Sequence, residues 1–274
     1  MWTKERVLEI YQEYQESKCT QKEIGEKYSF SAAYHFKKHG LTNRNFNTLR
    51  TNRKKLLWDG KEITNEKEAY ILGFWYADGY ITYQDQACIK LKDSESDRKL
   101  LEDIRDYICP EQELKKDKNS LVLKISSNSF CLNLINLGCL YEKTYKELNI
   151  PEMDESLLRH FIRGYFDGDG TVFFDRKYLK SNISSINKNF LEKIKKILDD
   201  NNIENRINIE KRKGKKMKKP LSDEYSITQK DMYRLYVSKR DALEKFKKFL
   251  YDDATIFLSR KKNVFYKDNI ELTK

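Results

Sequence analysis

Apolar residues recur at helical spacing in three short segments at the start of the chain. Thr20 and Glu23 have the spacing of a capping box, which predicts a second helix ending near Tyr28. Residues 29–31 read as a turn, and a third helix follows that ends at Gly40. The apolar sides of the first and third helices are formed by Val7, Leu8, Ile10, Tyr11 and Tyr14, and by Ala32, Ala33 and Phe36. The pattern predicts a small all-α unit over residues 1–41.

The segment TQKEIGEKYSFSAAYHFKKHGL, residues 20–41, resembles helix-turn-helix DNA-binding domains. It departs from them in two features, because Gly25 stands where a small Ala is usual and the turn is short. The resemblance implies that the third helix contacts DNA through Tyr34, His35, Lys37 and Lys38. A three-helix module for protein contacts is the alternative.

Residues 42–64 are basic and polar, and they lack periodicity until the apolar residues 56–58. This composition predicts a linker. Arg50 and Arg53 are candidates for phosphate or minor-groove contacts, and a solvated tether is the alternative interpretation.

From residue 65 onward the same order of elements occurs twice. Asn65 and Glu68 favour the start of a helix that contains AYILGFWYADG, and LLRHFIRGYFDGDG follows roughly ninety residues later. The expected strands are residues 80–83, 87–92 and 121–126, then 171–175, 182–185, 206–212 and 233–237. The expected helices are residues 94–108 and 128–137, then 188–200 and 240–251. We therefore predict an α+β core of two pseudo-symmetric αββαββα half-domains, residues 65–150 and 151–274.

The two glycine-containing helices carry small residues four positions apart, Gly73 with Ala77 and Gly164 with Gly168. Glycine inside a helix costs about 1 kcal/mol relative to alanine, and close approach of two backbones compensates for that cost. These four positions therefore predict an interface at which the two helices pack against each other.

One acid ends each of these helices, Asp78 in the first copy and Asp169 in the second. The helix macrodipole disfavours a carboxylate there. Two carboxylates about 5 Å apart at an effective dielectric constant near 20 repel by roughly 3 kcal/mol. A divalent cation between them accounts for the pair, and oxygen ligands without nearby Cys or His indicate Mg²⁺.

The sequences ILGFWYADG and IRGYFDGDG resemble the LAGLIDADG motif. LGCLYEKTYKELNIP and FLSRKKNVF resemble two further segments of that family, so the resemblance extends from residue 65 to the C-terminus. It implies a homing endonuclease that hydrolyses both strands of a long DNA target with bound Mg²⁺, with Mn²⁺ as a substitute. It also implies that a single chain with both motifs acts as a monomer.

The resemblance also assigns residues. Asp78 and Asp169 are the implied catalytic and metal-binding acids, and the residues before them, Ala77 and Gly168, are included in the metal site. Tyr76 replaces the usual acid two positions before Asp78. The implied central basic residues, which polarise the scissile phosphate, are Lys143 and Lys261, with Arg260 and Lys262 as equal alternatives to Lys261.

Alternation along the strands predicts which side chains face DNA. Apolar residues such as Ile89, Leu91, Ile207 and Ile209 are expected in the core. The outward residues expected to read the major groove are Lys90, Lys92, Lys124, Arg206, Asn208, Arg212, Arg234 and Tyr236. Residues 211–220, KRKGKKMKKP, are expected to form a flexible loop that contacts phosphates. Ordinary half-solvated strands would show the same alternation.

The net charge of +11 and the pI near 9.1 favour a polyanionic partner such as double-stranded DNA. The chain has no run of eighteen apolar residues and no apolar signal segment, and its five cysteines lack metal-site spacing. We expect a cytoplasmic protein of a bacterial or phage-infected cell, with no membrane partner. Two alternatives remain open: an intron maturase that binds intron RNA, and a catalytically silent DNA-binding regulator.

Overall fold

The computed structural model describes residues 2–17, 19–41, 54–140, 147–218 and 225–271. Its N-terminal part consists of α1 (Lys4–Glu16), α2 (Gln21–Lys27) and α3 (Ala32–Lys38). Thr20 and Glu23 form the predicted capping box, which satisfies two backbone N–H groups at the start of α2. These helices enclose their own apolar cluster, made of Val7, Ile10, Tyr14, Ile24, Ala32 and Phe36.

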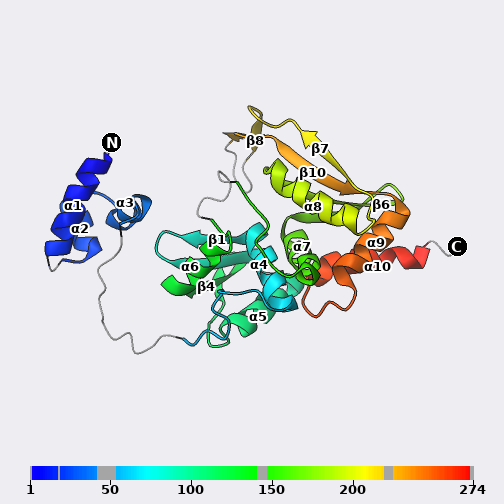
Figure 1. Ribbon diagram of the computed structural model, residues 1–274, viewed down its shortest axis with the longest axis horizontal. Coiled ribbons are helices and arrows are strands. Elements are labelled where there is room, and N and C mark those ends of the chain that lie inside the picture. Colours follow the sequence, from blue (N-terminus) through cyan, green and yellow to red (C-terminus); the bar gives the residue numbers. More distant parts are fainter. Residues whose placement is uncertain (1, 18, 42–53, 141–146, 219–224, 272–274) are drawn as a thin grey trace.

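The rest of the chain forms the predicted α+β core of two similar halves (Figure 1). The first half comprises α4 (Glu66–Asp78), β1 (Gly79–Thr82), β2 (Gln86–Lys92), α5 (Glu95–Ile108), β3 (Lys115–Asp117), β4 (Ser120–Ser126) and α6 (Asn128–Asn136). The second comprises α7 (Glu155–Asp169), β5 (Gly170–Asp175), β6 (Tyr178–Ser185), α8 (Lys188–Asp200), β7 (Arg206–Glu210), β10 (Met232–Val237) and α9 (Arg240–Tyr251). The αββαββα repeat is therefore confirmed, and α10 (Ser259–Glu271) follows it.

Each half contains a four-stranded antiparallel sheet, with the strand orders β1-β2-β4-β3 and β5-β6-β10-β7. The motif helices α4 and α7 lie side by side at the centre of the molecule, between the two halves (Figure 1). Residues 68–77 of α4 are all buried, which is typical of a helix enclosed on every side. The predicted placement of the motif helices at the interface is confirmed.

Four details differ from the expectations. The short strand β3 was missed because its three residues are all exposed and show no alternation. Within the predicted loop 211–220, β8 (Lys216–Lys218) pairs with β9 (Tyr225–Ile227), so the loop prediction is wrong for those residues. Helix α10 was not predicted. Ile209 is 51% exposed rather than in the core, and it lies on β7, an edge strand of its sheet.

Residues at the end of the predicted linker pack against the core. The Leu57 amide donates a hydrogen bond to the Ile108 carbonyl at 2.8 Å. Trp58 is buried, and its ring lies 6.0 Å from that of Phe130. The exact domain boundaries remain predictions. Among the described residues, no helix has both the length and the apolar character needed to cross a bilayer.

Candidate active site

The two motif helices approach closely at their glycines. A Cβ atom on Gly73 would lie 2.0 Å from the Phe161 carbonyl oxygen, and one on Gly164 would lie 2.0 Å from the Tyr70 carbonyl oxygen. Both distances are far below van der Waals contact, and both neighbours are backbone atoms of the opposite helix. No side chain larger than hydrogen fits at either position, which explains why glycine is tolerated inside these helices.

The predicted catalytic acids lie where this helix pair ends. Asp78 is the last residue of α4 and Asp169 the last of α7, and each is followed by a glycine that begins a strand. A Cβ on Gly168 would lie 3.3 Å from the Asp78 Oδ2 atom, so this carboxylate reaches the opposite helix. Burial raises the pKa of the Tyr165 hydroxyl well above its usual value, and the charges of Asp169 and Asp78 add to that shift. Both carboxylates therefore lie near one buried hydroxyl.

Lys261 enters this site from α10. Its side chain is 7% exposed, and Nζ donates to the carbonyl oxygens of Phe166, Gly168 and Gly170 at 2.8, 2.9 and 2.5 Å. These carbonyls lie at the C-terminal end of α7, where the macrodipole favours a cation. Burial lowers the pKa of Lys261 to about 8, while the nearby carboxylates, including Asp78 and Asp169, oppose the shift. Lys143, its expected counterpart, lies outside the described residues.

The donor set of this site suits a hard divalent cation. Asp78 and Asp169 offer carboxylate oxygens, which Mg²⁺ prefers, and Mg²⁺ commonly takes its remaining ligands from water and substrate phosphates. No cluster of three or more His, Cys, Asp or Glu side chains that could hold a metal ion occurs in the described part of the chain. Gly168 was also included in the implied metal site, and its carbonyl already accepts a hydrogen bond from Lys261. It retains one lone pair.

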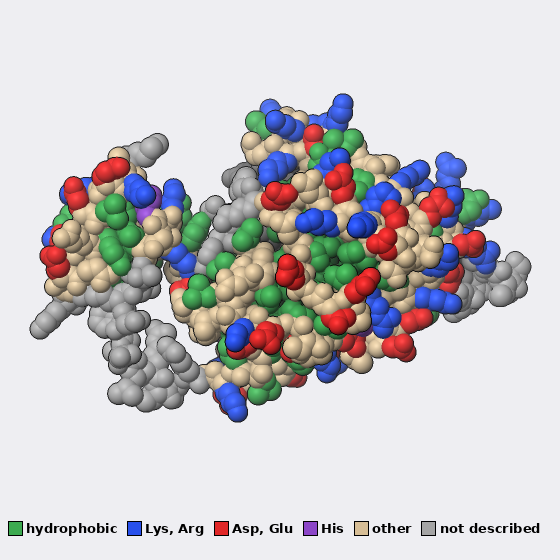
Figure 2. Space-filling model, in the orientation of Figure 1, with side chains coloured by type: hydrophobic (Ala, Val, Ile, Leu, Met, Phe, Trp, Pro, Cys, Tyr) green, Lys and Arg blue, Asp and Glu red, His purple; other side chains and the backbone are tan. Residues whose placement is uncertain are grey.

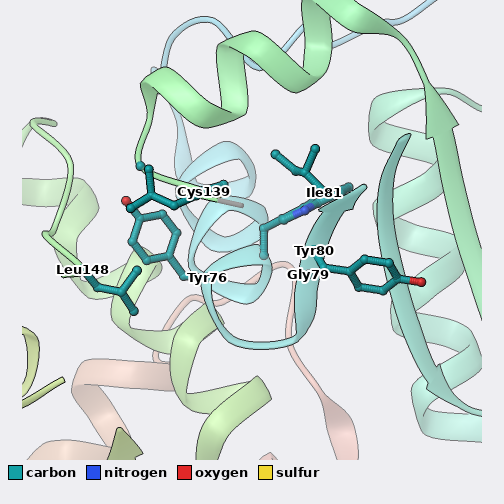
Figure 3. A pocket seen from close by; sticks show the side chains of 9 residues that line it. Tyr76, Gly79, Tyr80, Ile81, Cys139 and Leu148 are labelled. Carbon is teal, nitrogen blue, oxygen red and sulfur yellow. The ribbon is translucent and has the colours of Figure 1, made fainter. Parts of the chain in front are cut away.

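The position two residues before each acid carries different chemistry in the two halves. In the first half, the buried Tyr76 hydroxyl can donate to the Leu137 carbonyl oxygen at 2.7 Å or to the Asn149 carbonyl oxygen at 3.1 Å. Its ring lies among the residues that line a small pocket, with Cys139 and Leu148 (Figure 3). A Cβ on Gly138 would lie 1.9 Å from this hydroxyl. A small cavity of about 10 Å³ adjoins the ring, too little for more than one water molecule.

In the second half, the equivalent residue is Asp167, which is fully buried. Its carboxylate accepts hydrogen bonds from the Tyr251 hydroxyl at 2.6 Å, and from the Tyr70 hydroxyl and the Leu258 amide at 2.7 Å. Burial raises the pKa of Asp167, and these three donors oppose the shift. Sequence reasoning missed this role, although an acid inside an otherwise apolar helix face was a signal for it.

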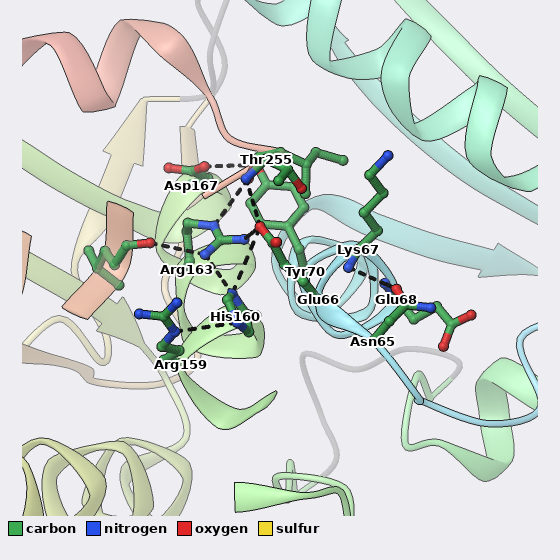
Figure 4. A network of polar contacts seen from close by, with 12 residues as sticks. Asn65, Glu66, Lys67, Glu68, Tyr70, Arg159, His160, Arg163, Asp167 and Thr255 are labelled. Atoms are coloured by element: carbon green, nitrogen blue, oxygen red, sulfur yellow. Dashed lines mark hydrogen bonds and ion pairs between the residues drawn. The ribbon is translucent and has the colours of Figure 1, made fainter. Parts of the chain in front are cut away.

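A second buried polar group holds the other end of the helix pair. Arg163 has no exposed surface, and its guanidinium donates to Glu66 Oε1 at 2.7 Å and to His160 Nδ1 at 2.7 Å (Figure 4). It also donates to the carbonyls of Ile256 and Leu250, each at 3.1 Å. Burial and the charge of Arg163 lower the pKa of His160 to about 4, so the imidazole is neutral at pH 7 and accepts this bond.

The predicted DNA-facing residues lie on one face of each sheet, except Arg212, which follows the end of β7 at Glu210. In the second sheet, cross-strand pairing puts Arg206 beside Tyr236 and Asn208 beside Arg234. Several of the cations have acidic partners that were not foreseen: Lys90 bonds Asp117 at 2.6 Å, and Glu210 bonds Arg212 at 2.8 Å and Arg234 at 2.9 Å. Lys92 is exposed and Lys124 half-buried. Figure 2 shows further basic side chains over β7 and β8.

In the N-terminal unit, the four residues expected to contact DNA have different surroundings. His35 stacks on Phe30 with ring centroids 5.4 Å apart, which makes it part of the packing. Tyr34 packs against Tyr83, and Lys37 forms an ion pair with Asp85, so these two meet the β1–β2 turn. Lys38 is exposed. Arg50 and Arg53 lie outside the described residues, and all these DNA contacts remain predictions.

Comparison with known proteins gives one family match. Residues 156–250, which include α7 and the strands and helices of the second half, match the LAGLIDADG-like domain. The resemblance stated from the sequence is therefore confirmed for that half. The first half has the same order of elements.

Several solved structures are similar to this chain. I-DmoI in complex with DNA and Ca has 18% identity and a TM-score of 0.46, covering 73% of this chain and 96% of that one. The meganuclease I-SmaMI bound to uncleaveable DNA has 11% identity and a TM-score of 0.49, covering 78% and 92%. The homing endonuclease I-GzeII with its DNA target has 13% identity and a TM-score of 0.49, covering 77% and 92%. No curated protein sequence matches.

Proposed function

We propose that the chain is a site-specific double-strand DNA endonuclease, because residues 156–250 match the LAGLIDADG-like domain. The observation that carries the proposal is the convergence of two carboxylates, Asp78 and Asp169, at the end of a tightly packed helix pair beside a buried lysine. Such an arrangement places like charges together at a dipole end that disfavours them. A function that needs both charges offsets this cost.

Asp78 and Asp169 would hold the divalent cation, Mg²⁺ or Mn²⁺, which when bound supplies Lewis-acid stabilisation of the attacking and leaving oxygens. The chain's own residues do the rest. The packed glycines fix the spacing of the two acids, since neither helix can slide without a backbone clash. Lys261 supplies positive charge at the end of α7, which offsets the macrodipole and favours an anionic phosphate there.

DNA would lie across the open faces of the two sheets. Their residues include Lys124 in the first sheet, and Arg206 and Tyr236 in the second, all groups that contact phosphates or base edges. Lys90 and Arg234 are paired with acidic side chains in the free protein. These acids offset part of the positive charge that would attract phosphates, so they limit the electrostatic part of the affinity for DNA. The N-terminal helices would extend the contacted length of DNA. One chain contains both halves, so a monomer suffices to cut both strands.

The test replaces each acid separately, Asp78→Asn and Asp169→Asn, with Asp103→Asn as the matched control. Asp103 lies on α5 and pairs with Lys99, so its replacement removes one negative charge away from the candidate site. A plasmid library with randomised inserts is incubated with each protein in Mg²⁺ or Mn²⁺, and linear products are sequenced. A target selected with the unchanged protein then serves for gel shifts in chelator.

We expect both site variants to lose linearisation and to keep or increase binding, since a negative charge beside the phosphates is gone. Their melting temperatures should hold or rise, because the repulsion between the acids is removed. The control variant should cut normally. Normal cutting by either site variant would remove these acids from the mechanism. Tight specific binding without cutting by the unchanged protein would instead identify a DNA-binding regulator.

A further inference from the structure

Asp167 connects the motif helix to the segment that carries Lys261. Its Oδ2 atom accepts the hydrogen bond of the Leu258 amide at 2.7 Å. The Leu258 carbonyl in turn accepts the amides of Lys261 at 3.0 Å and Lys262 at 3.2 Å, so Leu258 caps the first turn of α10. One carboxylate thus fixes the residue from which this helix starts.

The same carboxylate is fixed from the other side. Tyr70, on the opposite motif helix, and Tyr251, at the end of α9, both donate their hydroxyls to it. Asp167 has no exposed surface, and its three donor residues, Tyr70, Tyr251 and Leu258, are also buried. Solvent water therefore cannot replace the carboxylate as their acceptor. A buried acceptor with three donors holds its partners in one geometry, because breaking any bond leaves a polar group unsatisfied in the interior.

The first motif shows why this position need not be acidic. There Tyr76 faces two carbonyl oxygens, of Leu137 and Asn149, and a phenol donates where a carboxylate would repel. In the second motif the group to be held is an amide, which requires an acceptor. The residue at each position therefore has the hydrogen-bonding character that its backbone partner requires: a donor for the carbonyl oxygens in the first half and an acceptor for the amide in the second.

We propose that Asp167 is a positioning residue that holds the start of α10 so that Lys261 lies at the end of α7 beside Asp169. The hydrogen bonds support the placement of α10 by Asp167. The expected effect on DNA cleavage rests in addition on the proposed nuclease function. Lys261 reaches three carbonyls at once, so a small shift of α10 would break this arrangement. A displacement of about 1 Å in a reacting group slows an enzyme by up to about a hundredfold.

The first measurement needs no cleavage. Hydrogen exchange of residues 256–262 is followed by mass spectrometry in the unchanged protein, in Asp167→Leu and in Asp167→Asn. Leucine keeps the branched outline, with methyl groups somewhat larger than the two oxygens, and removes the acceptor, while asparagine keeps the size, one oxygen for the Leu258 amide and an amide that can donate to the Tyr251 oxygen. We expect at least tenfold faster exchange in the leucine variant and near-normal exchange in the asparagine variant. Equal exchange in all three proteins would overturn the proposal.

Leucine at this site leaves three buried donors without a partner, so a second variant protects against loss of folding. Asp167→Leu is also made in a Tyr70→Phe/Tyr251→Phe background, where only the Leu258 amide is left unsatisfied. The background itself is the matched control, because it retains the bond from Asp167 to Leu258. Adding Asp167→Leu to this background must make residues 256–262 exchange faster. If it does not, the hydrogen bond between Asp167 and the Leu258 amide does not hold the start of α10.

The second measurement reads the consequence. Each strand of the selected target duplex is labelled separately, and single-turnover rates are compared. We expect the leucine variants to cut one strand about tenfold to a hundredfold more slowly at unchanged KM, with rescue by asparagine. Equal slowing of both strands would overturn the positioning role. If the unchanged protein cuts no DNA, the proposed function fails, and the exchange data still decide whether Asp167 holds α10.

Discussion

Gly168 and Ala77 meet across the motif-helix interface so closely that exchanging their side chains gives a sharp test of the packing. A Cβ on Gly168 would lie 2.2 Å from the Ala77 Cβ, whereas carbon atoms in contact are about 3.5–4.0 Å apart. Gly168→Ala alone must therefore push the helices apart by more than about 1 Å, and overpacking of this kind costs roughly 1–3 kcal/mol. The helix preference of alanine returns at most about 1 kcal/mol.

Ala77→Gly alone should cost about 1 kcal/mol in helix preference and roughly 0.8 kcal/mol for the lost methyl group. In the double variant the methyl group has moved from one helix to the other. Its next neighbours would be the Ala77 Cα at 3.5 Å and the Asp78 Oδ2 at 3.3 Å, which are tolerable. The two propensity effects then cancel, and the double variant should lie within about 1 kcal/mol of the unchanged protein.

The expected coupling between the two substitutions is thus about 2–4 kcal/mol, well above the error of additivity. Urea unfolding of all four proteins, followed by tryptophan fluorescence of the core, measures it. Strand cleavage provides a second readout, because separation of the helices also separates Asp78 from Asp169. Single-variant losses that add within about 0.5 kcal/mol would refute the argument that these atoms are in contact.

Three further predictions follow from the surrounding groups. His160 has a pKa near 4 in the folded protein against 6.5 unfolded, so stability should fall by up to about 3 kcal/mol as pH drops from 6.5 to 4. His160→Gln, which keeps an acceptor for Arg163, should remove most of that slope in urea titrations at each pH. Glu66→Gln should destabilise the protein by a few kcal/mol, because Arg163 stays buried without its counter-charge. The double variant Glu66→Gln/Arg163→Met should lower the melting temperature less than Glu66→Gln alone, because it leaves no buried unpaired charge. Removal of residues 1–53 should weaken binding to the selected target and make the dependence of affinity on salt concentration shallower, and an unchanged salt slope would contradict DNA contacts in that segment.

Local patterns were sufficient to predict the repeat and the interface. The helical and strand periodicities describe single segments, and the two motif copies carry the same small residues at the same spacing, so Gly73 and Gly164 could be paired without coordinates. The pattern failed where a segment buries little. Strand β3 is wholly exposed and β8 has only three residues, Lys216–Lys218, so neither is long enough to show the alternation on which a strand prediction depends.

The polar contacts of the site could not be read from local patterns, because each joins residues distant in sequence. The acidic partners of the DNA-facing cations are examples, since Asp117 is on a different strand from Lys90. Lys261 is another. Its family position identified it as a basic residue near the acids, but the sequence does not show that α10 aims its amine at the carbonyls of Phe166, Gly168 and Gly170.

The position of Lys261 bears on how the two acids coexist. Three carbonyl oxygens at the end of α7 accept from the buried amine, and the carboxylates of Asp167, Asp78 and Asp169 add negative charge around it. A buried ammonium is costly alone, and its pKa falls accordingly, yet here every N–H donor of the amine has an acceptor. The lysine and the acids therefore stabilise one another's charged forms. Removing Asp169 weakens the reason for Lys261 to be charged, so the two residues should be treated as one electrostatic unit when variants of this site are compared.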